Sequence, residues 1–307
     1  MTSASRRLWT ASPLTYGALI LAALLSVWPI YYMFVVSTRS LDSINSSPPP
    51  FLPGGSFFDN FGKATGTPAP GSDTFYDTKG TFFGIELPAV YLGIINSFIV
   101  ASLVTVGVVL FGTLAGFAFA KLQFRGRNVL LLLILVTMMV PTQLGLIPLY
   151  DMMTRLGDYE VIGSVLGYDK LGSVIVPFMV SAFGVFLMRQ YATQAVPDEL
   201  IEAARVDGCS SLRIYWSVVL PALRPAAAVL GLLTFMEQWN SFLWPYAILY
   251  DDNPTVQVSL AYLSNAYYID YSLVFAATAV ATLPLIVIFV IFGRQIIGGI
   301  MEGAVKA

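Results

Sequence analysis

The sequence lacks histidine entirely and contains a single cysteine, Cys209, among its 307 residues. Without histidine it has neither the commonest general base near neutral pH nor the commonest metal ligand. A single cysteine also excludes a disulfide within the chain. Most residue sets on which an enzyme could be built are therefore excluded at the start.

Charge is also scarce. Charged residues make up 11% of the chain, against about 25% in an average soluble domain, and hydrophobic residues make up 57%. A chain with so much apolar and so little charged surface is typical of membrane proteins.

A phosphate-binding loop is missing as well. Such a loop needs a lysine followed by serine or threonine, with a glycine five residues before the Gly-Lys pair. The only Gly-Lys pair, Gly62-Lys63, is followed by Ala64 and lacks the upstream glycine. The sequence therefore predicts that this chain binds no ATP and no other cofactor itself.

Long apolar runs are what the chain does contain. A helix that crosses the ~30 Å hydrocarbon core of a bilayer needs about 20 apolar residues. Six runs meet this length, at 14–36, 90–120, 129–149, 172–190, 222–245 and 272–293. Pro141 and Pro148 in the third run and Pro177 in the fourth predict kinks. We predict an all-α fold, a polytopic membrane bundle of six transmembrane helices.

The distribution of basic residues predicts the orientation. If the N-terminus is cytoplasmic, 11 of the 16 lysines and arginines lie on the cytoplasmic side. The positive-inside rule then places both termini in the cytoplasm. The predicted organisation is a cytoplasmic N-terminus at 1–13 and a transmembrane domain at 14–307, with an extracytoplasmic segment at 37–89, a cytoplasmic loop at 191–221 and a cytoplasmic tail at 294–307. Proline and glycine predict irregular structure in the extracytoplasmic segment, and residues 64–89 have no assigned role.

The most polar segment lies between the fourth and fifth predicted spans. Asp198 follows a proline and is suited to cap a helix over residues 199–207. Gly208 can adopt the left-handed conformation that ends a helix. Ser210 or Ser211 can then cap a second helix that leads into the fifth span.

The first of these two helices is amphipathic and too short to be stable alone in water. One side carries Leu200, Ala203, Ala204 and Val206, and the other carries Glu199, Glu202 and Arg205. The helix must therefore pack against something. The residues alone leave two possibilities open, a partner protein or the inner leaflet of the membrane.

A known family has the same pattern of residues in this segment. Glu202-Ala203-Ala204, then Gly208, Val218 and Leu220-Pro221 resemble the EAA loop of permease subunits in binding-protein-dependent ABC importers. That family usually has isoleucine at the position of Val218 and alanine at the position of Cys209. The segments SPPPFLPGGSFFDNFGKA, SAFGVFLMRQ, WNSFLWP and RQIIGGIMEGAVKA are similar to carbohydrate-importer permeases, of the maltose-permease second-subunit type.

The resemblance implies a non-catalytic permease subunit in the cytoplasmic membrane of a bacterium or archaeon. Its partners would be a second permease subunit, two cytoplasmic ATPases that carry ATP and Mg, and an extracytoplasmic solute-binding protein; membrane lipid and a sugar would also contact it, but not nucleic acid. The residues that it implies for ATPase coupling are Glu199, Glu202, Ala203, Ala204, Asp207, Gly208, Leu220 and Pro221. Closure of the ATPases around ATP would then drive alternating access to the sugar path.

Glu237 is the only carboxylate inside a predicted span, which makes it a candidate functional residue. With Gln238, Trp239, Asn240 and Trp244 it offers hydrogen-bonding groups and aromatic faces that suit a sugar. Glu237 could instead bond to a neighbouring helix or to the partner permease. The tryptophans could instead form an interfacial aromatic belt.

The kind of solute stays open within this interpretation. A disaccharide or oligosaccharide is favoured by the resemblance, while a monosaccharide, a polyol and glycerol phosphate are not excluded. The alternative function is an ion-coupled secondary transporter of a small polar solute. Such a transporter is expected to carry acidic residues in several spans, and only Glu237 qualifies here.

Two glycines in the second predicted span, Gly112 and Gly116, stand four residues apart. Small residues at this spacing let two helix backbones approach closely inside a membrane. We therefore predict a tight helix contact along this face.

Overall fold

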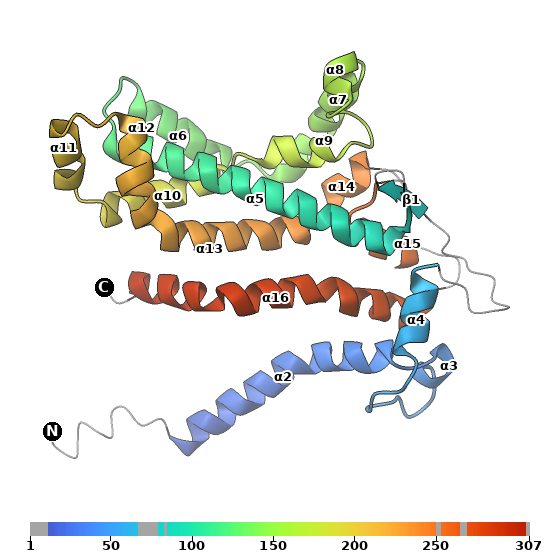
Figure 1. The fold of residues 1–307 in the computed structure, drawn as a ribbon. Helices are drawn as coiled ribbons and strands as arrows, with labels where there is room; N and C mark the ends of the chain where they lie inside the picture. Colours follow the sequence, from blue (N-terminus) through green and yellow to red (C-terminus); the bar gives the residue numbers. More distant parts are fainter. Residues whose placement is uncertain (1–11, 67–78, 83–84, 250–252, 265–268, 305–307) are drawn as a thin grey trace. The chain divides into compact units, whose positions relative to one another are not determined.

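The computed structural model describes residues 12–66, 79–82, 85–249, 253–264 and 269–304. The described part of the chain is almost entirely helical (Figure 1). It divides into two compact units, Met1–Asp77 with Tyr262–Ala281, and Thr78–Ala261 with Thr282–Ala307. Most of the predicted N-terminal segment, 1–11, and the last tail residues, 305–307, lie outside the described residues.

The first unit contains α2 (Pro13–Ser37), α3 (Leu41–Ile44), α4 (Phe57–Ala64) and the start of α16 (Tyr271–Ala304). The α2 helix begins after Ser12, whose hydroxyl accepts a hydrogen bond from the Thr15 N–H. At its other end, the Asn60 amide donates to the carbonyls of Ser37 and Arg39 at 2.9 and 2.8 Å. The described part of 37–89 therefore has no long helix, as predicted, but its short helices are fixed to the end of α2.

The second unit begins with an antiparallel hairpin that the all-α prediction did not include. The elements from the hairpin onward are β1 (Lys79–Phe82), β2 (Ile85–Pro88), α5 (Ala89–Lys121), α6 (Arg127–Thr137), η1 (Thr142–Gly145), α7 (Leu146–Gly157), α8 (Glu160–Gly163), α9 (Leu171–Ile175), η2 (Val176–Phe178), α10 (Ala182–Ala195), α11 (Asp198–Val206), α12 (Ser211–Ile214), η3 (Tyr215–Val219), α13 (Leu220–Trp239), α14 (Leu243–Ile248) and α15 (Val256–Ser264). In the hairpin Lys79 pairs with Pro88. The long helix α5 packs along both α10 and α13 and forms the centre of this unit (Figure 1).

The predicted spans are confirmed at five places. Among the described residues, the helices long and apolar enough to cross a membrane are Pro13–Ser37, Ala89–Lys121, Leu171–Ala195, Ser211–Trp239 and Tyr271–Gly293. The fifth predicted span was placed too far along the chain, because the helix ends at Trp239 and not at residue 245. Apolar residues continue past this end, so composition alone does not detect it.

The third predicted span, 129–149, is not a straight helix. Its two parts, Arg127–Thr137 and Thr142–Gly157, meet at an angle of 91°, and they count as one span only if the bend is included. Pro141 lies at the break, where its ring has no N–H to donate and restricts the residue before it. Pro177 interrupts the fourth span in the same way, within the 3₁₀ turn η2. Pro148 lies in the first turn of α7 without a break.

The predicted close contact at Gly112 and Gly116 is confirmed, and the partner is α10. A Cβ atom on Gly116 would lie 2.6 Å from the Met188 Cβ, and one on Gly112 would lie 3.3 Å from the Gly184 backbone. Side chains at these positions would separate the helices. The small residues therefore hold α5 and α10 in direct backbone contact.

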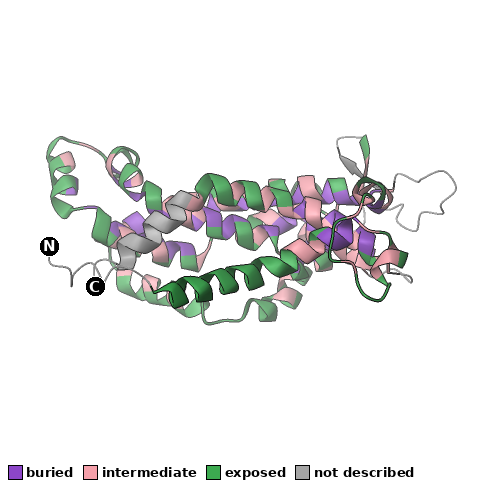
Figure 2. Cartoon of the chain, turned by 90° about the horizontal axis from the view of Figure 1, so that it is seen from below, coloured by how far each residue is buried: buried purple, intermediate pink, exposed green. Residues whose placement is uncertain are grey.

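Large apolar residues remain exposed on the long helices, and Figure 2 shows long exposed stretches of helix in green. In the most apolar stretch of α2 only 11% of residues are buried by the chain itself, and in α16 only 17%. Exposed apolar surface of this extent requires an apolar environment. Lipid or a partner subunit within the membrane supplies such an environment.

Candidate functional site

The predicted short helix between the fourth and fifth spans is α11, and it ends at the predicted glycine. Gly208 adopts a left-handed backbone with φ of 77°. Its N–H donates to the Arg205 carbonyl, and the Cys209 N–H donates to the Ala204 carbonyl. This pair of bonds is a Schellman motif, which satisfies the last carbonyls of the helix. Apart from the adjacent residues, nothing in the described part of the chain lies within 4 Å of where a Gly208 Cβ would be, so the backbone conformation, and not space, requires glycine.

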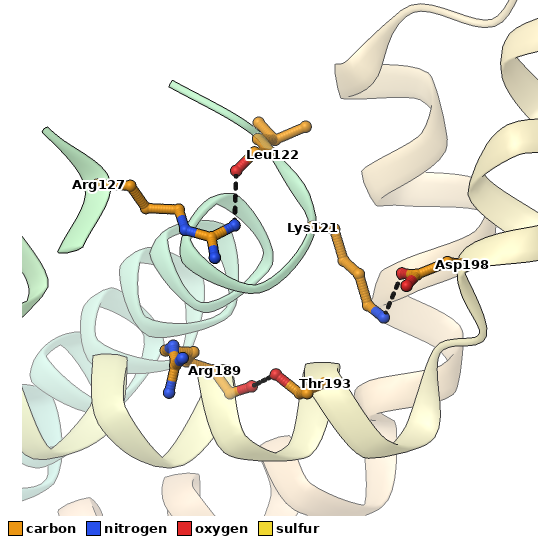
Figure 3. Close-up of polar contacts among 6 residues, drawn as sticks. All are labelled: Lys121, Leu122, Arg127, Arg189, Thr193 and Asp198. Carbon is orange, nitrogen blue, oxygen red and sulfur yellow. Dashed lines mark hydrogen bonds and ion pairs between the residues drawn. The ribbon is translucent and has the colours of Figure 1, made fainter. Parts of the chain in front are cut away.

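Asp198 does not cap α11, which corrects the prediction. It is the first helical residue, after the N-cap Pro197, and its carboxylate instead accepts a 2.7 Å bond from the Lys121 ammonium at the end of α5 (Figure 3). The Lys121 side chain is only 5% exposed, whereas that of Asp198 is 76% exposed. The pair therefore supplies a nearly buried cation with its counter-ion and ties α11 to α5.

The side of α11 that faces the rest of the chain is centred on a residue that the sequence analysis placed on neither side. Ile201 is the buried residue of the helix at 3% exposure, while Leu200 is 51% and Val206 is 88% exposed. Ile201 packs in an apolar cluster with residues from α5, α10 and the segment after α11. That cluster consists of Phe117, Ala192, Val196, Ile201, Ile214, Tyr215, Val219 and Leu223. On the side expected to meet a partner or the membrane, Leu200 and Val206 are thus open to another molecule, whereas Ala204 packs against the cluster.

The second helix of the segment continues without interruption into α13. Ser210 caps it by accepting a bond from the Arg213 N–H, so of the two serines considered, Ser210 is the cap. The next turn, η3, is a π-helical turn that comes just before Pro221. Within η3, the buried Tyr215 hydroxyl lies 2.8 Å from the Thr113 hydroxyl of α5. This hydrogen bond joins the segment to the central helix.

The residues predicted for ATPase coupling mostly lie on the surface. Glu199, Glu202, Ala203, Asp207, Gly208 and Pro221 are exposed, and Ala204 and Leu220 are half-buried. Cys209 is a half-buried free thiol beside the Ile201 cluster. An exposed surface of small and acidic residues next to Leu200 and Val206 is suited to bind a protein.

A polar cavity of about 500 Å³ lies beside α11. Its charged lining residues are Lys121, Arg127, Asp198, Glu202 and Arg205. Arg127 also donates to the Leu122 carbonyl at 3.2 Å (Figure 3). On the neighbouring α10, the Nε of Arg189 is buried and has no hydrogen-bond partner within the described residues. Buried donors are normally satisfied, so Arg189 is an exception among the described residues.

The predicted substrate residues lie near the other end of α13, where there are two adjoining cavities. One has a volume of about 400 Å³ and the other about 330 Å³, and both are lined by Glu237, Gln238, Thr142 and Phe178. Thr142 follows the bend of the third span, so the bend helps to form the cavities. Glu237 is exposed, and no described residue pairs with it. A bond from Glu237 to a neighbouring helix is therefore not seen in the described part of the chain.

Unlike Glu237 and Gln238, the two tryptophans and Asn240 do not line both cavities. Trp239 is fully buried and stacks on Phe235, which makes the interfacial-belt interpretation wrong for this residue. Trp244 is also buried and donates a 3.0 Å bond to the Ser173 carbonyl, although its ring borders the larger cavity. Asn240 is exposed and its side chain caps the end of α13 through the Met236 carbonyl. Of the predicted set, only Glu237, Gln238 and Trp244 line a cavity.

Three residues in this region were missed by the sequence analysis as parts of the site. Lys121 entered the sequence analysis only as one of the basic residues counted for orientation, and Ile201 and Tyr215 were given no packing role. An opposite charge at Asp198 on the same predicted side of the membrane was the available signal for Lys121. No signal in one sequence indicates which apolar residue of such a short helix is buried.

The site offers binding surfaces and no cluster of catalytic groups. Within the described ranges, no three aspartate, glutamate or cysteine side chains are grouped so that they could hold a metal ion. The architecture is that of a polytopic membrane protein, with long apolar helices, cavities between some of them and one short amphipathic helix exposed at an end. The chain belongs to the family of binding-protein-dependent transport system inner membrane components, whose pattern matches residues 109–300.

Several characterised permeases are similar to it. The arabinooligosaccharides transport system permease protein AraQ of Halalkalibacterium halodurans is 33% identical over 69% of this chain and 72% of its own length. The lactose transport system permease protein LacG of Rhizobium radiobacter is 31% identical over 100% of both chains. The sn-glycerol-3-phosphate transport system permease protein UgpE of Yersinia pestis is 29% identical over 92% of this chain and 94% of its own.

A solved structure shares the fold. It is the crystal structure of a bacterial ABC transporter involved in the import of the acidic polysaccharide alginate. The matched chain is 24% identical, with a TM-score of 0.72, and the match covers 96% of this chain and 98% of that one. Together these findings make the chain a multi-pass inner-membrane permease subunit of the carbohydrate ABC importer type.

Proposed function

We propose that this chain forms half of the translocation path of an ATP-driven sugar importer and that α11 is its contact with a separate ATPase. The observation that supports this proposal best is the structure of α11. One side of the helix is fastened to the bundle by Ile201 and by the Lys121–Asp198 pair. The opposite side, with Leu200 and Val206, is left exposed.

The fastening explains how force would enter the membrane helices. Movement of α11 would act on α5 through Lys121 and on α13 through the continuous helix that begins at Ser211. The hydrogen bond between Tyr215 and Thr113 links these two routes. Because packed helices move as rigid bodies, closure of two ATPases would shift α5 and α13 together and change the side to which the path opens.

The remaining components follow from this role. ATP and Mg would be bound by two ATPase subunits, a second permease would supply the other half of the path, and a solute-binding protein would deliver the sugar. The subunit itself would catalyse nothing. In this arrangement α11, with the loop 191–221, and both termini face the cytoplasm, and the segment 37–89 faces outward, as the basic residues predict.

The cargo we propose is a disaccharide or oligosaccharide, of the kind handled by a maltose-permease second subunit. The printed names of two relatives refer to arabinooligosaccharides and lactose, which supports this class. A third name refers to sn-glycerol-3-phosphate, so relatedness alone does not separate neutral from anionic cargo. Glu237, Gln238 and Trp244 are the residues that we place at the path.

Two other functions are less well supported. An ion-coupled transporter would need several intramembrane acids, whereas the described spans carry one in their apolar stretches, Glu237. A membrane-surface role for α11 would call for a strongly basic face. Its charged residues are Asp198, Glu199, Glu202 and Arg205, so the helix is acidic on balance and anionic lipid would repel it.

The direct test is to purify the chain with its co-expressed partners and reconstitute the complex in nanodiscs. ATP hydrolysis is measured with and without the solute-binding protein across a panel of neutral sugars. We expect stimulation only when the receptor and a suitable sugar are both present. The matched control is the same preparation without the two ATPase subunits.

Crosslinking would test the role of α11 separately. A photoreactive residue at position 206 is expected to crosslink to the ATPase, because Val206 is 88% exposed on the open face. The same probe at position 201 should crosslink within the chain. Crosslinks from position 206 to lipid alone, or sugar transport by the isolated chain, would contradict the proposal.

A further inference from the structure

The two cavities near Glu237 form a space large enough for a sugar. Their volumes of about 400 and 330 Å³ fall within the range of roughly 300–1,000 Å³ that is usual for small-molecule sites. Thr142, Phe178, Glu237 and Gln238 line both of them. The cavities therefore adjoin and can accept consecutive sugar units.

The lining suits a carbohydrate. Gln143, Gln238 and Ser241 offer hydrogen-bond donors and acceptors, and Phe178 and Phe242 offer apolar aromatic surface. A sugar ring presents hydroxyls around its edge and C–H groups on its faces, so it needs both kinds of contact.

The charged group in the lining of the two cavities is negative. Glu237 is the only charged side chain among the described residues that line the two cavities, and none of those residues is a lysine or arginine. No described residue neutralises its carboxylate. Binding of a phosphate or carboxylate group normally uses arginine or lysine, and a lone carboxylate repels such a group.

We propose that these cavities are a site for neutral oligosaccharides and that Glu237 is a specificity residue that rejects sugars carrying a negative charge. This inference rests on the proposed function and narrows its cargo. It separates this chain from glycerol phosphate and from uronic acid polymers as substrates.

The test measures equilibrium binding of radiolabelled sugars to the permease–ATPase complex in nanodiscs, without the solute-binding protein. Three pairs serve as probes: lactose and lactobionate, maltose and maltobionate, arabinobiose and its aldonate. The members of each pair differ by oxidation of the reducing carbon, which adds one carboxylate and opens one ring. Because ring opening affects every variant alike, the preference for the neutral sugar is compared between variants.

We expect the wild-type complex to bind at least one neutral sugar about tenfold more tightly than its aldonate, a difference of about 1.4 kcal/mol. Glu237→Gln should reduce this preference to about twofold, mainly by improving aldonate binding, since a single repulsive charge is removed. Glu237→Asp keeps the charge and should keep the preference. Glu160→Gln removes an exposed carboxylate outside both cavities and should leave the preference unchanged.

Two results would overturn the inference: an aldonate that binds the wild type as tightly as its neutral partner, or a preference that Glu237→Gln does not change. If none of the six probes binds at millimolar concentration, the cavities are not a sugar site and the inference also fails. Receptor-stimulated ATP hydrolysis by the same preparation would still support the importer function, so the two failures are distinguishable.

Discussion

The two ends of α13 are built in opposite ways. At the end that joins α11, buried apolar residues, an ion pair and a buried hydrogen bond attach the segment to α5 and α10. At the other end, the helix stops at Trp239 beside two mainly apolar cavities and a bent span. The first end, called here the packed end, is fastened by these contacts, although a polar cavity lies beside α11. The second, called here the hollow end, carries the cavities lined by Glu237 and Gln238.

This difference indicates that the two ends of α13 have different functions. Close-packed contacts transmit movement because they have few alternative arrangements. Cavities lined by hydrogen-bonding groups bind ligands and can be changed without loss of the fold. Substitutions at the packed end should therefore impair coupling or stability, and substitutions at the hollow end should change sugar affinity.

The largest effect is expected at the glycine turn. Proline fixes φ near −65°, whereas Gly208 has φ of 77°, so Gly208→Pro should cost roughly 3 kcal/mol or more at the turn. Receptor-stimulated ATP hydrolysis should fall by about 100-fold or more, with the complex still assembled on an affinity column. Gly208→Asn is the control, because asparagine tolerates this conformation better than other residues. Full activity of the proline variant would contradict the role of the turn.

The buried anchor of α11 should have the next largest effect. Ile201→Ala removes the side chain that holds the helix on its apolar cluster and should cost about 2–3 kcal/mol. We expect faster hydrogen exchange in residues 198–206 and fewer sugar molecules transported per ATP. Leu200→Ala changes a residue that is 51% exposed on the same helix. It should leave the exchange rates as they are and weaken ATPase binding instead.

The ion pair should show an asymmetry. Asp198→Asn leaves the nearly buried Lys121 ammonium without its counter-ion, which should cost about 1–3 kcal/mol in coupling or stability. Lys121→Met leaves only an exposed carboxylate unpaired and should be milder. The exchanged pair, Lys121→Asp with Asp198→Lys, should recover part of the activity. Equal effects of both single changes would argue that burial of Lys121 is unimportant.

The smallest effect is expected at the hollow end. Gln238→Ala removes hydrogen-bonding groups from both cavities and should raise the KM for a neutral sugar by about 2- to 10-fold, the loss of about one hydrogen bond. The maximal rate of ATP hydrolysis should not change. Gln194→Ala, an exposed glutamine of α10 outside both cavities, serves as the control. A fall in the maximal rate without a change in KM would contradict the view that this end of α13 determines sugar affinity and the other end determines coupling.

Hydropathy and a few glycines made much of the fold predictable. Four spans were located within a few residues, because a membrane-crossing helix must be long and apolar, whereas the predicted run 222–245 lies too far along the chain for the helix Ser211–Trp239. Gly208 was predictable because few other residues adopt a positive φ, and the contact at Gly116 because small residues allow close helix packing.

What escaped prediction depends on tertiary contacts. Lys121 and Asp198 are 77 positions apart in the chain, and no local pattern indicates that they meet. Apolar residues occur on both sides of α11, so only packing against α5 and α10 decides that Ile201 is buried. Apolar composition continues through Phe242 and Trp244, which hid the end of α13 at Trp239. For the cavities, the sequence indicated Glu237 and Gln238 but not the bend that brings Thr142 to them.

The π-helical turn η3 determines which way the side chains of the following helix α13 face relative to those of α12. Ile214 and Val219 are both buried in one cluster although they are five residues apart, and the next buried position, Leu223, follows after four. A π turn accommodates one residue more than an α turn, so it keeps these side chains on one face despite the longer spacing. Deleting one residue within η3 should convert it to an ordinary α turn with the apolar stripe intact. The same deletion inside α13 would rotate every later side chain by about 100°.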